Sequence, residues 1–414
     1  MESLQSLFGL AVFVGLCYAC SENRNAVKIK LLITSLALQF GLALVLLKIP
    51  AMQHLFMFLN QVVLELQTAT EAGTAFMFGY LGGAALPYEE NLPGASYILA
   101  FRALPLLLLT SVISSLLVYW RILPLLMRAF SFFLEKTLGI GGAVGLSVAA
   151  NAFIGMVESP LLIRPYLNKL TRSELFTVMC AGLATISGTM LALEASVISA
   201  VVPDAVGHLL SASLITLPGV IPIGHLLIPE STQITTGKTP IERGADSIMD
   251  AITSGTQNGL NLLMNIIAMI VVMVALVYLI NAVLALLPAI HDAPITLERG
   301  LGWLMAPLTW LMGVPWSEVT VAGQLMGVKT VLTEFLAYLQ MGQLPADALD
   351  QRSKITMTYA LCGFANFISL GIMLTGLTIM VPERRAEVLE LGLKSLVGGT
   401  IATSCTAAIV GVIL

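Results

Sequence analysis

Long apolar runs constrain this chain more than any other feature. They recur from one end of the sequence to the other, and each is close to the ~20 residues that cross a bilayer as a helix. Backbone polar groups inside a bilayer need partners within the protein, so only helices and closed barrels can span it. Runs of this length favour helices. We therefore predict an all-α integral membrane protein.

The composition agrees with this class. Hydrophobic residues make up 57% of the 414 positions and charged residues 11%, whereas about a quarter of a soluble domain is charged. The first run opens with an acidic residue and lacks a clear cleavage site, so we interpret it as a retained first helix.

Eight apolar windows are predicted to span the membrane: 4–20, 30–49, 103–120, 174–201, 207–228, 250–288, 355–381 and 390–414. The window 250–288 is too long for an upright helix, so it should tilt or extend beyond the bilayer. Residues 50–100 begin with an amphipathic, interfacial segment. Their second half, EAGTAFMFGYLGGAALPYEENLPG, is predicted to turn at its glycines and prolines.

Two further apolar stretches, 138–167 and 316–341, fit a simple span less well. Each carries a glutamate near its middle, Glu158 and Glu334, with small or helix-breaking residues around it. Irregular backbone is tolerated at membrane depth where protein or a water-filled cavity surrounds it. We therefore predict two re-entrant hairpins, each of which enters and leaves the membrane on one side.

The basic residues test this arrangement, because cytoplasmic loops carry an excess of Lys and Arg. With both termini outside, 14 of the 20 basic residues lie on the cytoplasmic side. Those 14 are Arg24, Lys28, Lys30, Arg121, Arg128, Lys136, Arg164, Lys169, Arg172, Lys238, Arg243, Arg384, Arg385 and Lys394. Of the others, Lys329 lies within a hairpin. Counting either hairpin as a full crossing would weaken the bias.

Cysteines and histidines are predicted to have no metal-binding or catalytic role. Cys17 and Cys20 lack partner ligands at metal-binding spacing, so packing is the favoured interpretation. The histidines are scattered and lie at positions 54, 208, 225 and 291. No zinc-protease motif, phosphate-binding glycine loop or Ser/His/Asp arrangement is present in the sequence, so we predict no enzyme.

The helices that follow the two hairpins resemble each other. GLAT at 182–185 and GFAN at 363–366 are each preceded by a cysteine and followed by a serine and a glycine. Each half of the chain thus has a hairpin and then a helix interrupted by small polar residues. Paired interrupted helices point to the binding site of a secondary transporter, because their free N–H and carbonyl groups can bind a solute or a cation.

The hairpin glutamates fit this interpretation. A glutamate facing lipid would cost ~2.5 kcal/mol or more, so both are predicted to face protein, water or ligand. A structural carboxylate paired with an arginine is an alternative for either one alone, but the repeat favours a transport role. An ion channel with two pore loops and a membrane-embedded enzyme are alternatives from other classes.

Four separated motifs resemble those of the concentrative nucleoside transporters of bacteria. They are GLSVAANAFIGMVESPLLIRPYL, GLATISG, GVPWSEVTVAGQLMGVKTVLTEFLAY and YALCGFANFISLGIM, and their order and spacing agree over nearly the whole chain. The segment EAGTAFMFGYL near residue 75 also agrees. The resemblance implies a multi-pass homotrimer in the bacterial inner membrane that imports nucleosides, binds no nucleic acid, and couples transport to a cation gradient, with Na⁺ favoured over a proton.

The resemblance also implies a division into a fixed scaffold and a transport domain that moves as an elevator. The scaffold would consist of residues 1–133 and 248–290. The transport domain would consist of residues 137–228, with the first hairpin and spans 4 and 5, and residues 296–414, with the second hairpin and spans 7 and 8.

The family's binding residues carry over position by position. The nucleobase would lie beside Gly155, Met156, Val157 and Glu158 of the first hairpin and Met190 of the fourth span. The ribose would lie beside Glu334, Asn366 and Ser369, with Phe364 next to the sugar. The backbone carbonyls of Asn151, Ile154 and Ile186 and the hydroxyl of Thr185 would hold Na⁺, a hard cation that prefers oxygen ligands.

The chain departs from the family pattern at the first hairpin. Met156 and Val157 replace two hydrogen-bonding side chains, so we expect a preference shifted from strict uridine selectivity towards purine nucleosides or a broad range. Thr333 stands where the family usually has asparagine, which puts one supporting contact in doubt. Glu194 is expected near the outer surface rather than in the site, because it lies about 13 Å along a helix from Thr185. A proton-coupled nucleoside transporter, or a transporter of the same fold for another polar solute, is the alternative function.

Overall fold

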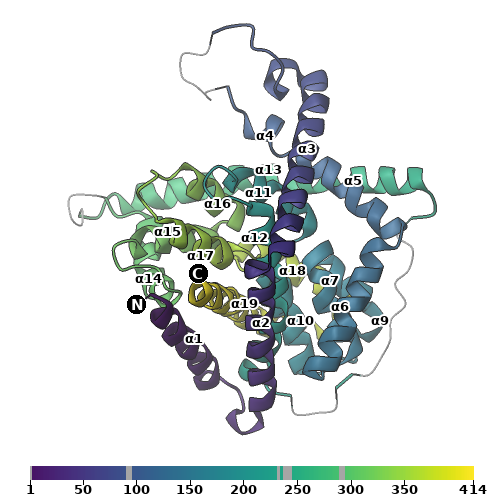
Figure 1. The fold of residues 1–414 in the computed structure, drawn as a ribbon, viewed down its shortest axis with the longest axis vertical. Coiled ribbons are helices and arrows are strands. Elements are labelled where there is room, and N and C mark those ends of the chain that lie inside the picture. Colours follow the sequence, from purple (N-terminus) through teal and green to yellow (C-terminus); the bar gives the residue numbers. More distant parts are fainter. Residues whose placement is uncertain (1, 90–95, 231–233, 236–244, 289–293) are drawn as a thin grey trace.

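The structure is a computed structural model that describes residues 2–89, 96–230, 234–235, 245–288 and 294–414 (Figure 1). In these ranges the chain is helical and contains no strand. The α-helices are α1 (Glu2–Ala19), α2 (Ile29–Lys48), α3 (Pro50–Phe78), α4 (Leu99–Arg102), α5 (Leu106–Tyr119), α6 (Ile122–Leu138), α7 (Gly142–Ile154), α8 (Glu158–Leu162), α9 (Arg164–Leu167), α10 (Arg172–Ala184), α11 (Gly188–Ile198), α12 (Ala205–Leu227), α13 (Ile248–Leu284), α14 (Leu297–Leu311), α15 (Val319–Val331), α16 (Glu334–Gln343), α17 (Gln351–Leu361), α18 (Phe367–Met380) and α19 (Arg385–Ile413). Short 3₁₀ helices are η1 (Arg24–Ala26), η2 (Gly79–Gly82) and η3 (Pro382–Arg384).

The predicted spans correspond to helices of the structure. Among the described residues, 7 helical stretches are long and apolar enough to cross a membrane. The eighth predicted span, 355–381, is divided into α17 and α18 by residues 362–366, and neither half is long enough alone. The window 174–201 is likewise divided into α10 and α11 at residues 185–187. The prediction of interrupted helices in corresponding places is confirmed.

Both stretches with a central glutamate form a helix, a tight turn and a second helix. In the first, α7 ends at Ile154 and α8 begins at Glu158, with Gly155 between them at a φ of 102° that glycine tolerates best. In the second, α15 and α16 meet at Leu332 and Thr333, and the Thr333 hydroxyl caps α16 by accepting the Leu336 N–H. We call these pairs hairpin 1 and hairpin 2.

The segment after residue 70 differs from its prediction. The helix α3 continues through Gly73 to Phe78 instead of turning at EAG. A single glycine inside a helix costs only about 1 kcal/mol, and here the chain turns at the later glycines. Gly82 then folds back onto α3, where the Thr74 hydroxyl donates to its carbonyl oxygen at 2.7 Å. The continuous helix is therefore longer than the amphipathic segment that the sequence indicates.

Small residues let α5 and α13 pack closely. A Cβ at Gly255 would lie 2.7 Å from the Val112 Cα, and one at Gly259 would lie 2.9 Å from the Leu108 Cα. Helix α1 packs chiefly on α19, and α2 packs chiefly on α12. The first two spans thus lie against the predicted transport domain, and the division between scaffold and transport domain stays a prediction.

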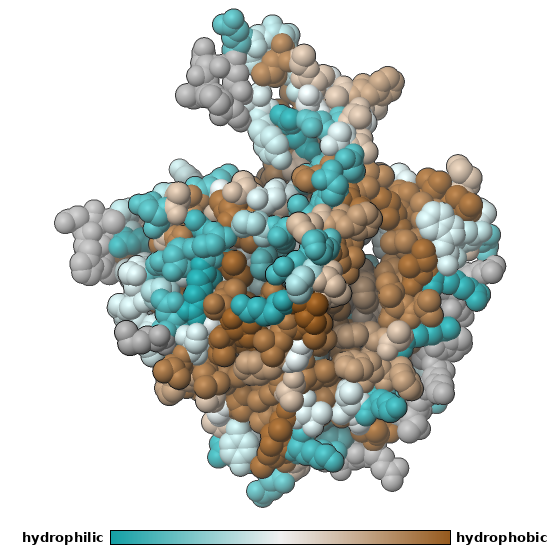
Figure 2. Space-filling view, in the orientation of Figure 1, coloured by the Kyte–Doolittle hydropathy of each residue, from teal (hydrophilic) through white to brown (hydrophobic). Residues whose placement is uncertain are grey.

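The surface and the chain ends fit a multi-pass membrane protein. Figure 2 shows hydrophobic side chains over much of the centre and the right of one face, with hydrophilic ones in its upper part, on its left side and at its lower end. The two ends of the chain lie close together, since Arg352 donates both to the Glu2 carboxylate and to the Gly411 carbonyl oxygen. At another edge, Arg172 and Lys394 pair with Glu22, and Arg172 also pairs with Glu390.

The cysteines and histidines lie apart from these features. Cys17 is buried, as packing predicts, whereas Cys20 is exposed and lies directly after the last residue of α1. The His208 ring lies against Tyr359, with its Nδ1 atom 3.1 Å from the hydroxyl oxygen. Lys238, Arg243 and His291 lie outside the described residues.

Candidate functional site

The end of hairpin 1 meets the break of the fourth span. The Asn151 side-chain amide donates to the Ala181 carbonyl oxygen and to the Thr185 hydroxyl, both at 2.5 Å. Its own oxygen accepts from the Ser159 hydroxyl at 3.1 Å. Asn151 and Thr185 are fully buried. A neutral network of oxygens and amides therefore joins α7 and α8 to the end of α10.

Two glycines allow the backbones to approach at this junction. A Cβ at Gly188 would lie 3.0 Å from the Phe153 carbonyl oxygen, and one at Gly155 would lie 3.4 Å from the Ser187 Cβ. Ile154 is the last residue of α7, and Ile186 lies within the break of the fourth span. The last carbonyls of a helix lack intrahelical partners, so this junction concentrates backbone oxygens. All four predicted Na⁺ ligands thus belong to one junction.

The tip of hairpin 1 is seated between α10 and α18. A Cβ at Gly182 would lie 3.3 Å from the Met156 Cβ, and one at Gly376 would lie 3.0 Å from a Val157 methyl carbon. Met156 and Val157, the two residues that depart from the family pattern, thus each pack on one of these glycines. Both side chains are half-buried, so part of each is committed to packing.

Glu158 has a different environment from its neighbours at the tip. Glu158 is exposed, whereas Met156 and Val157 beside it are half-buried. The N-terminus of a helix favours a negative charge, and Glu158 is the first residue of α8. No ion pair to Glu158 is present among the described residues, so the alternative of a structural carboxylate paired with arginine finds no support here.

Hairpin 2 meets the break of the seventh span. The Asn366 side-chain amide donates to the Glu334 carboxylate at 2.8 Å, and its oxygen accepts the Ser369 N–H at 2.7 Å, which caps α18. Glu334, Asn366 and Ser369 are all buried. One asparagine therefore both ends the break and fixes the carboxylate of the hairpin.

The two breaks touch each other. Gly363 has a φ of 137°, and a Cβ there would lie 2.8 Å from both the carbonyl carbon and the carbonyl oxygen of Ala184. Ala184 is the last residue of α10, directly before Thr185. The contact therefore joins the neighbours in sequence of Thr185 and of Phe364, which come from different halves of the chain.

Lys329 belongs to the same region and was not predicted to have a role. It is fully buried in α15, and its ammonium group donates to the Ala360 carbonyl oxygen at 2.7 Å and to the Thr403 hydroxyl at 3.4 Å. It also interacts electrostatically with Glu334. Its signal in the sequence was a basic residue inside an apolar stretch, which in membrane proteins suggests a function.

The expectation for Glu194 is wrong. Its side chain is completely buried and interacts electrostatically with Glu334 and Lys329. The expected position assumed one continuous helix from Thr185. The break at residues 185–187 starts a new helix, α11, which packs against α16 of hairpin 2. Glu194 thus lies beside the hairpin 2 cluster.

The other predicted site residues lie around these contacts. Met190 and Phe364 are buried, and the Met190 N–H completes the first turn of α11 by donating to the Ser187 hydroxyl at 3.4 Å. The structure thus brings the predicted residues to two junctions, one at each break. Their contacts with nucleoside and Na⁺ stay predictions.

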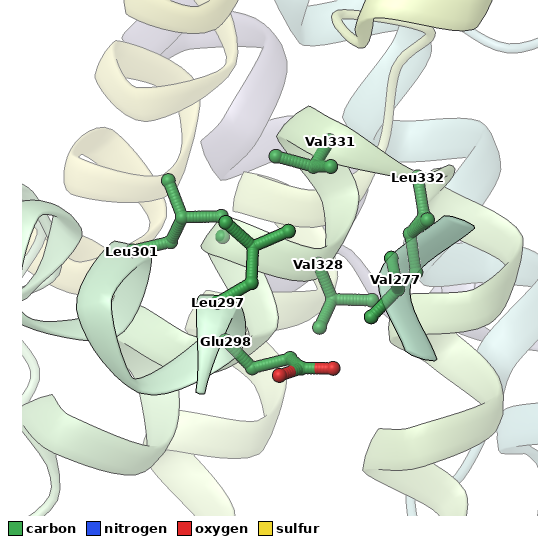
Figure 3. A pocket seen from close by; sticks show the side chains of 8 residues that line it. Val277, Leu297, Glu298, Leu301, Val328, Val331 and Leu332 are labelled. Carbon is green, nitrogen blue, oxygen red and sulfur yellow. The ribbon is translucent and has the colours of Figure 1, made fainter. Parts of the chain in front are cut away.

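A separate pocket lies between α13, α14 and α15 (Figure 3). Figure 3 shows apolar side chains around it, including Val277, Leu301 and Leu332, with the Glu298 carboxylate at one side. The Asn281 amide donates to Glu298 at 3.1 Å, so this carboxylate already has a partner. None of the predicted site residues lines this pocket.

Comparison with protein families gives matches along most of the chain. Models described as the N-terminus and the C-terminus of the Na⁺ dependent nucleoside transporter match residues 8–81 and 208–411. A model described as nucleoside recognition, named Gate, matches residues 100–201.

Full-length relatives agree with these matches. Nucleoside permease NupC of Helicobacter pylori is 31% identical, and the alignment covers 100% of this chain and 98% of that protein. The uncharacterized transporter YutK of Bacillus subtilis is 33% identical, with 100% of both chains covered.

Solved structures share the fold. CNTnw in an inward-facing substrate-bound state is 32% identical with a TM-score of 0.90, and the match covers 100% of this chain and 98% of that chain. A double variant of CNTnw in an outward-facing state is 33% identical with a TM-score of 0.91, and the match covers 100% and 97%.

Proposed function

This chain belongs to the Na⁺-dependent nucleoside transporter family, which makes it a multi-pass importer of nucleosides coupled to Na⁺ and not an enzyme, and we propose that the two junctions described above form its transport site. The contact between the two helix breaks, Gly363 against Ala184, carries this proposal. This contact brings together the polar groups of the first junction and those of the second, which suit different ligands. Membership of the family also decides against the ion channel.

The first junction suits the cation. Na⁺ would bind to the backbone carbonyls of Asn151, Ile154 and Ile186 and to the hydroxyl of Thr185. Oxygen ligands fit a hard cation, and helix ends at a break supply carbonyls without intrahelical partners. The Asn151 amide supports this role, because it fixes the Thr185 hydroxyl and the end of α10 in place.

The second junction suits the ribose. Glu334 and Asn366 would bind the sugar hydroxyls, with Ser369 beside them and Phe364 against the sugar ring. A carboxylate and an amide provide the acceptors that a diol needs, and a site built for hydroxyls rejects analogues that lack them. The retained Glu334–Asn366 hydrogen bond argues against a substrate without a ribose.

The tip of hairpin 1 and Met190 would face the nucleobase. Glu158 is the polar group at this tip, with Gly155 beneath its carboxylate, where a Cβ would lie 2.8 Å from an Oε atom. Met156 and Val157 leave fewer hydrogen-bonding groups for a pyrimidine. We propose a preference for purine nucleosides or a broad range, since methionine adapts to a large apolar base face.

Transport would proceed by an elevator motion of the hairpins with spans 4, 5, 7 and 8 against a scaffold of spans 1, 2, 3 and 6. The close crossing of α5 and α13 supports a rigid scaffold element. Three copies would associate through the scaffold in a bacterial inner membrane, with the hairpins re-entrant and both termini outside. The shared Arg352 contacts support placing both termini on one side.

The test is uptake into proteoliposomes under an imposed Na⁺ gradient with uridine, cytidine, adenosine and inosine. We expect Na⁺-driven uptake of the purine nucleosides at least as fast as that of uridine. Met156→Gln should shift the uridine to adenosine ratio about 10-fold towards uridine, the scale of one hydrogen-bonded contact. Met156→Leu, which keeps the apolar seat on Gly182, should leave the ratio unchanged.

Two outcomes would contradict the proposal. Uptake that follows a pH gradient alone and ignores Na⁺ would exclude the ion assignment. Tight selectivity for uridine in the unmodified protein would exclude the proposed role of Met156 and Val157. Failure of every ribonucleoside to raise the melting temperature of the purified protein would favour another polar solute.

A further inference from the structure

Glu194 is buried without a hydrogen-bond partner. Its side chain has a relative exposure of 0%, and neither carboxylate oxygen has a donor among the residues that the structure describes. Most buried polar atoms in proteins are hydrogen-bonded, so each exception needs an explanation. A charged carboxylate in this state would carry a large desolvation cost.

The neighbouring charges do not pair with Glu194. Lys329 interacts with it electrostatically, but the Lys329 ammonium group donates to the Ala360 carbonyl and the Thr403 hydroxyl instead. Glu334, the other charged group that acts on Glu194, is held by Asn366. The Tyr338 hydroxyl donates to the Thr358 carbonyl oxygen at 2.7 Å, so it is also engaged.

The helices packed against α11 add no counter-charge. These helices are α3, α5, α7, α12 and α16. The described parts of α5 and α7 contain no acidic or basic residue, and α16 contributes Glu334. The acidic residues and histidines of α3 and α12 do not act electrostatically on Glu194; they are His54, Glu65, Glu71, His208 and His225.

Charge balance then determines the state of Glu194. One lysine can neutralise one carboxylate in this buried region, and Glu334 is the carboxylate fixed by a hydrogen bond. A second negative charge at Glu194 would remain uncompensated, which is strongly unfavourable in a dry interior. The group formed by Glu194, Lys329 and Glu334 has no net charge when a monovalent cation is bound to the Glu194 carboxylate.

We propose that Glu194 is a proton-binding site, and that the protein moves a proton together with Na⁺ and nucleoside. This inference rests on the proposed function. A proton fits better than a second Na⁺, because a proton needs only one carboxylate oxygen, whereas a hard cation needs several oxygen ligands and a positive Lys329 lies close by. The carboxylate would take up the proton on the outer side and release it on the inner side, so that the O–H bond formed is later broken and no other reactant is needed.

The test uses the intact protein in proteoliposomes that contain a trapped pH-sensitive dye. Na⁺ and pH are equal on both sides, and K⁺ with valinomycin holds the membrane potential at zero. Addition of nucleoside should then acidify the lumen, with about one proton for each nucleoside that enters. Glu194→Gln copies the protonated side chain, and should reduce this acidification at least about 10-fold while Na⁺-driven uptake stays within about 3-fold of the unmodified protein.

Controls separate a proton site from a structural role. Glu65→Gln, which changes an exposed glutamate on α3, should leave acidification unchanged. Glu194→Asp keeps a titrating group and should retain acidification; if the glutamine variant does not fold, this variant and the unmodified protein decide the matter.

The outcomes distinguish this inference from the function it rests on. Na⁺-driven uptake without acidification in the unmodified protein would overturn the proton site and leave the proposed function intact. Equal acidification in Glu194→Gln would do the same. A lower ratio of ²²Na⁺ to nucleoside in Glu194→Gln, with no change in proton flux, would show that the site takes Na⁺. Absence of all Na⁺-driven uptake would instead overturn the proposed function.

Discussion

The two halves of the chain repeat one architecture but fill it with different chemistry. In the first half, the junction of hairpin and broken helix is neutral, and Asn151, Thr185 and Ser159 bond to one another. In the second half, the equivalent junction carries the Glu334 carboxylate and lies near Lys329. The repeat thus provides two equivalent frames, and under the proposed function the different side chains suit one frame to a cation and the other to a solute with hydroxyl groups.

The largest effect should come from removing the charge in the second half. Glu334→Gln removes the carboxylate that compensates Lys329 and weakens a charge-assisted hydrogen bond, so nucleoside kcat/KM should fall by about 100-fold or more. Glu158→Gln, in the first half, should lower kcat/KM less, because Glu158 is exposed and has no ion pair in the described structure. Initial rates of uptake measure both, and an equal loss in the two variants would break the distinction between the halves.

A smaller effect is expected where the halves touch. Gly363→Ala places a Cβ 2.8 Å from the Ala184 carbonyl group at a φ of 137°, which should destabilise the protein by about 2–3 kcal/mol. Gly371→Ala is the matched control, because nothing lies within 4 Å of its Cβ. Thermal unfolding in detergent compares the two. Equal stability would mean that the contact between the breaks is loose.

At the neutral junction of the first half, we expect substitution to change the dependence on Na⁺. Asn151→Ala removes the hydrogen bonds that hold Thr185 and the end of α10, so the Na⁺ concentration for half-maximal uptake should rise about 10-fold. Asn366→Ala should instead raise the nucleoside KM with little change in Na⁺ dependence. If both variants change the same parameter, the assignment of one ligand to each half fails.

The smallest effect lies outside the membrane. The hydrogen bond from Arg172 lowers the pKa of Glu22, so the stabilisation that this pair contributes is present above the usual pKa of a glutamate and is lost as the pH falls through the lowered value. Glu22→Gln should therefore reduce the melting temperature by about 1 °C at neutral pH, as expected for a partly exposed ion pair, and by less in acid. A loss that grows as the pH falls would contradict the sign.

Much of this architecture could be predicted from residues that act locally. Apolar runs indicate the spans, a glutamate within such a run indicates each hairpin, and the GLAT and GFAN repeats indicate the two breaks. The burial of Glu194 could not be predicted, because it depends on the direction that α11 takes after its break. Met156 and Val157 pack on glycines of helices that are distant in the sequence, and no local pattern predicts such contacts.

The contact of Gly363 with Ala184 also has a thermodynamic consequence. If bound Na⁺ makes the first break more rigid, the contact also makes the second break more ordered. Less conformational entropy is then lost when the nucleoside binds, so the nucleoside binds more tightly. Linkage makes this relation mutual: the factor by which Na⁺ raises nucleoside affinity equals the factor by which nucleoside raises Na⁺ affinity. Each ligand alone then binds more weakly by this same factor, which reduces transport of Na⁺ without nucleoside and of nucleoside without Na⁺.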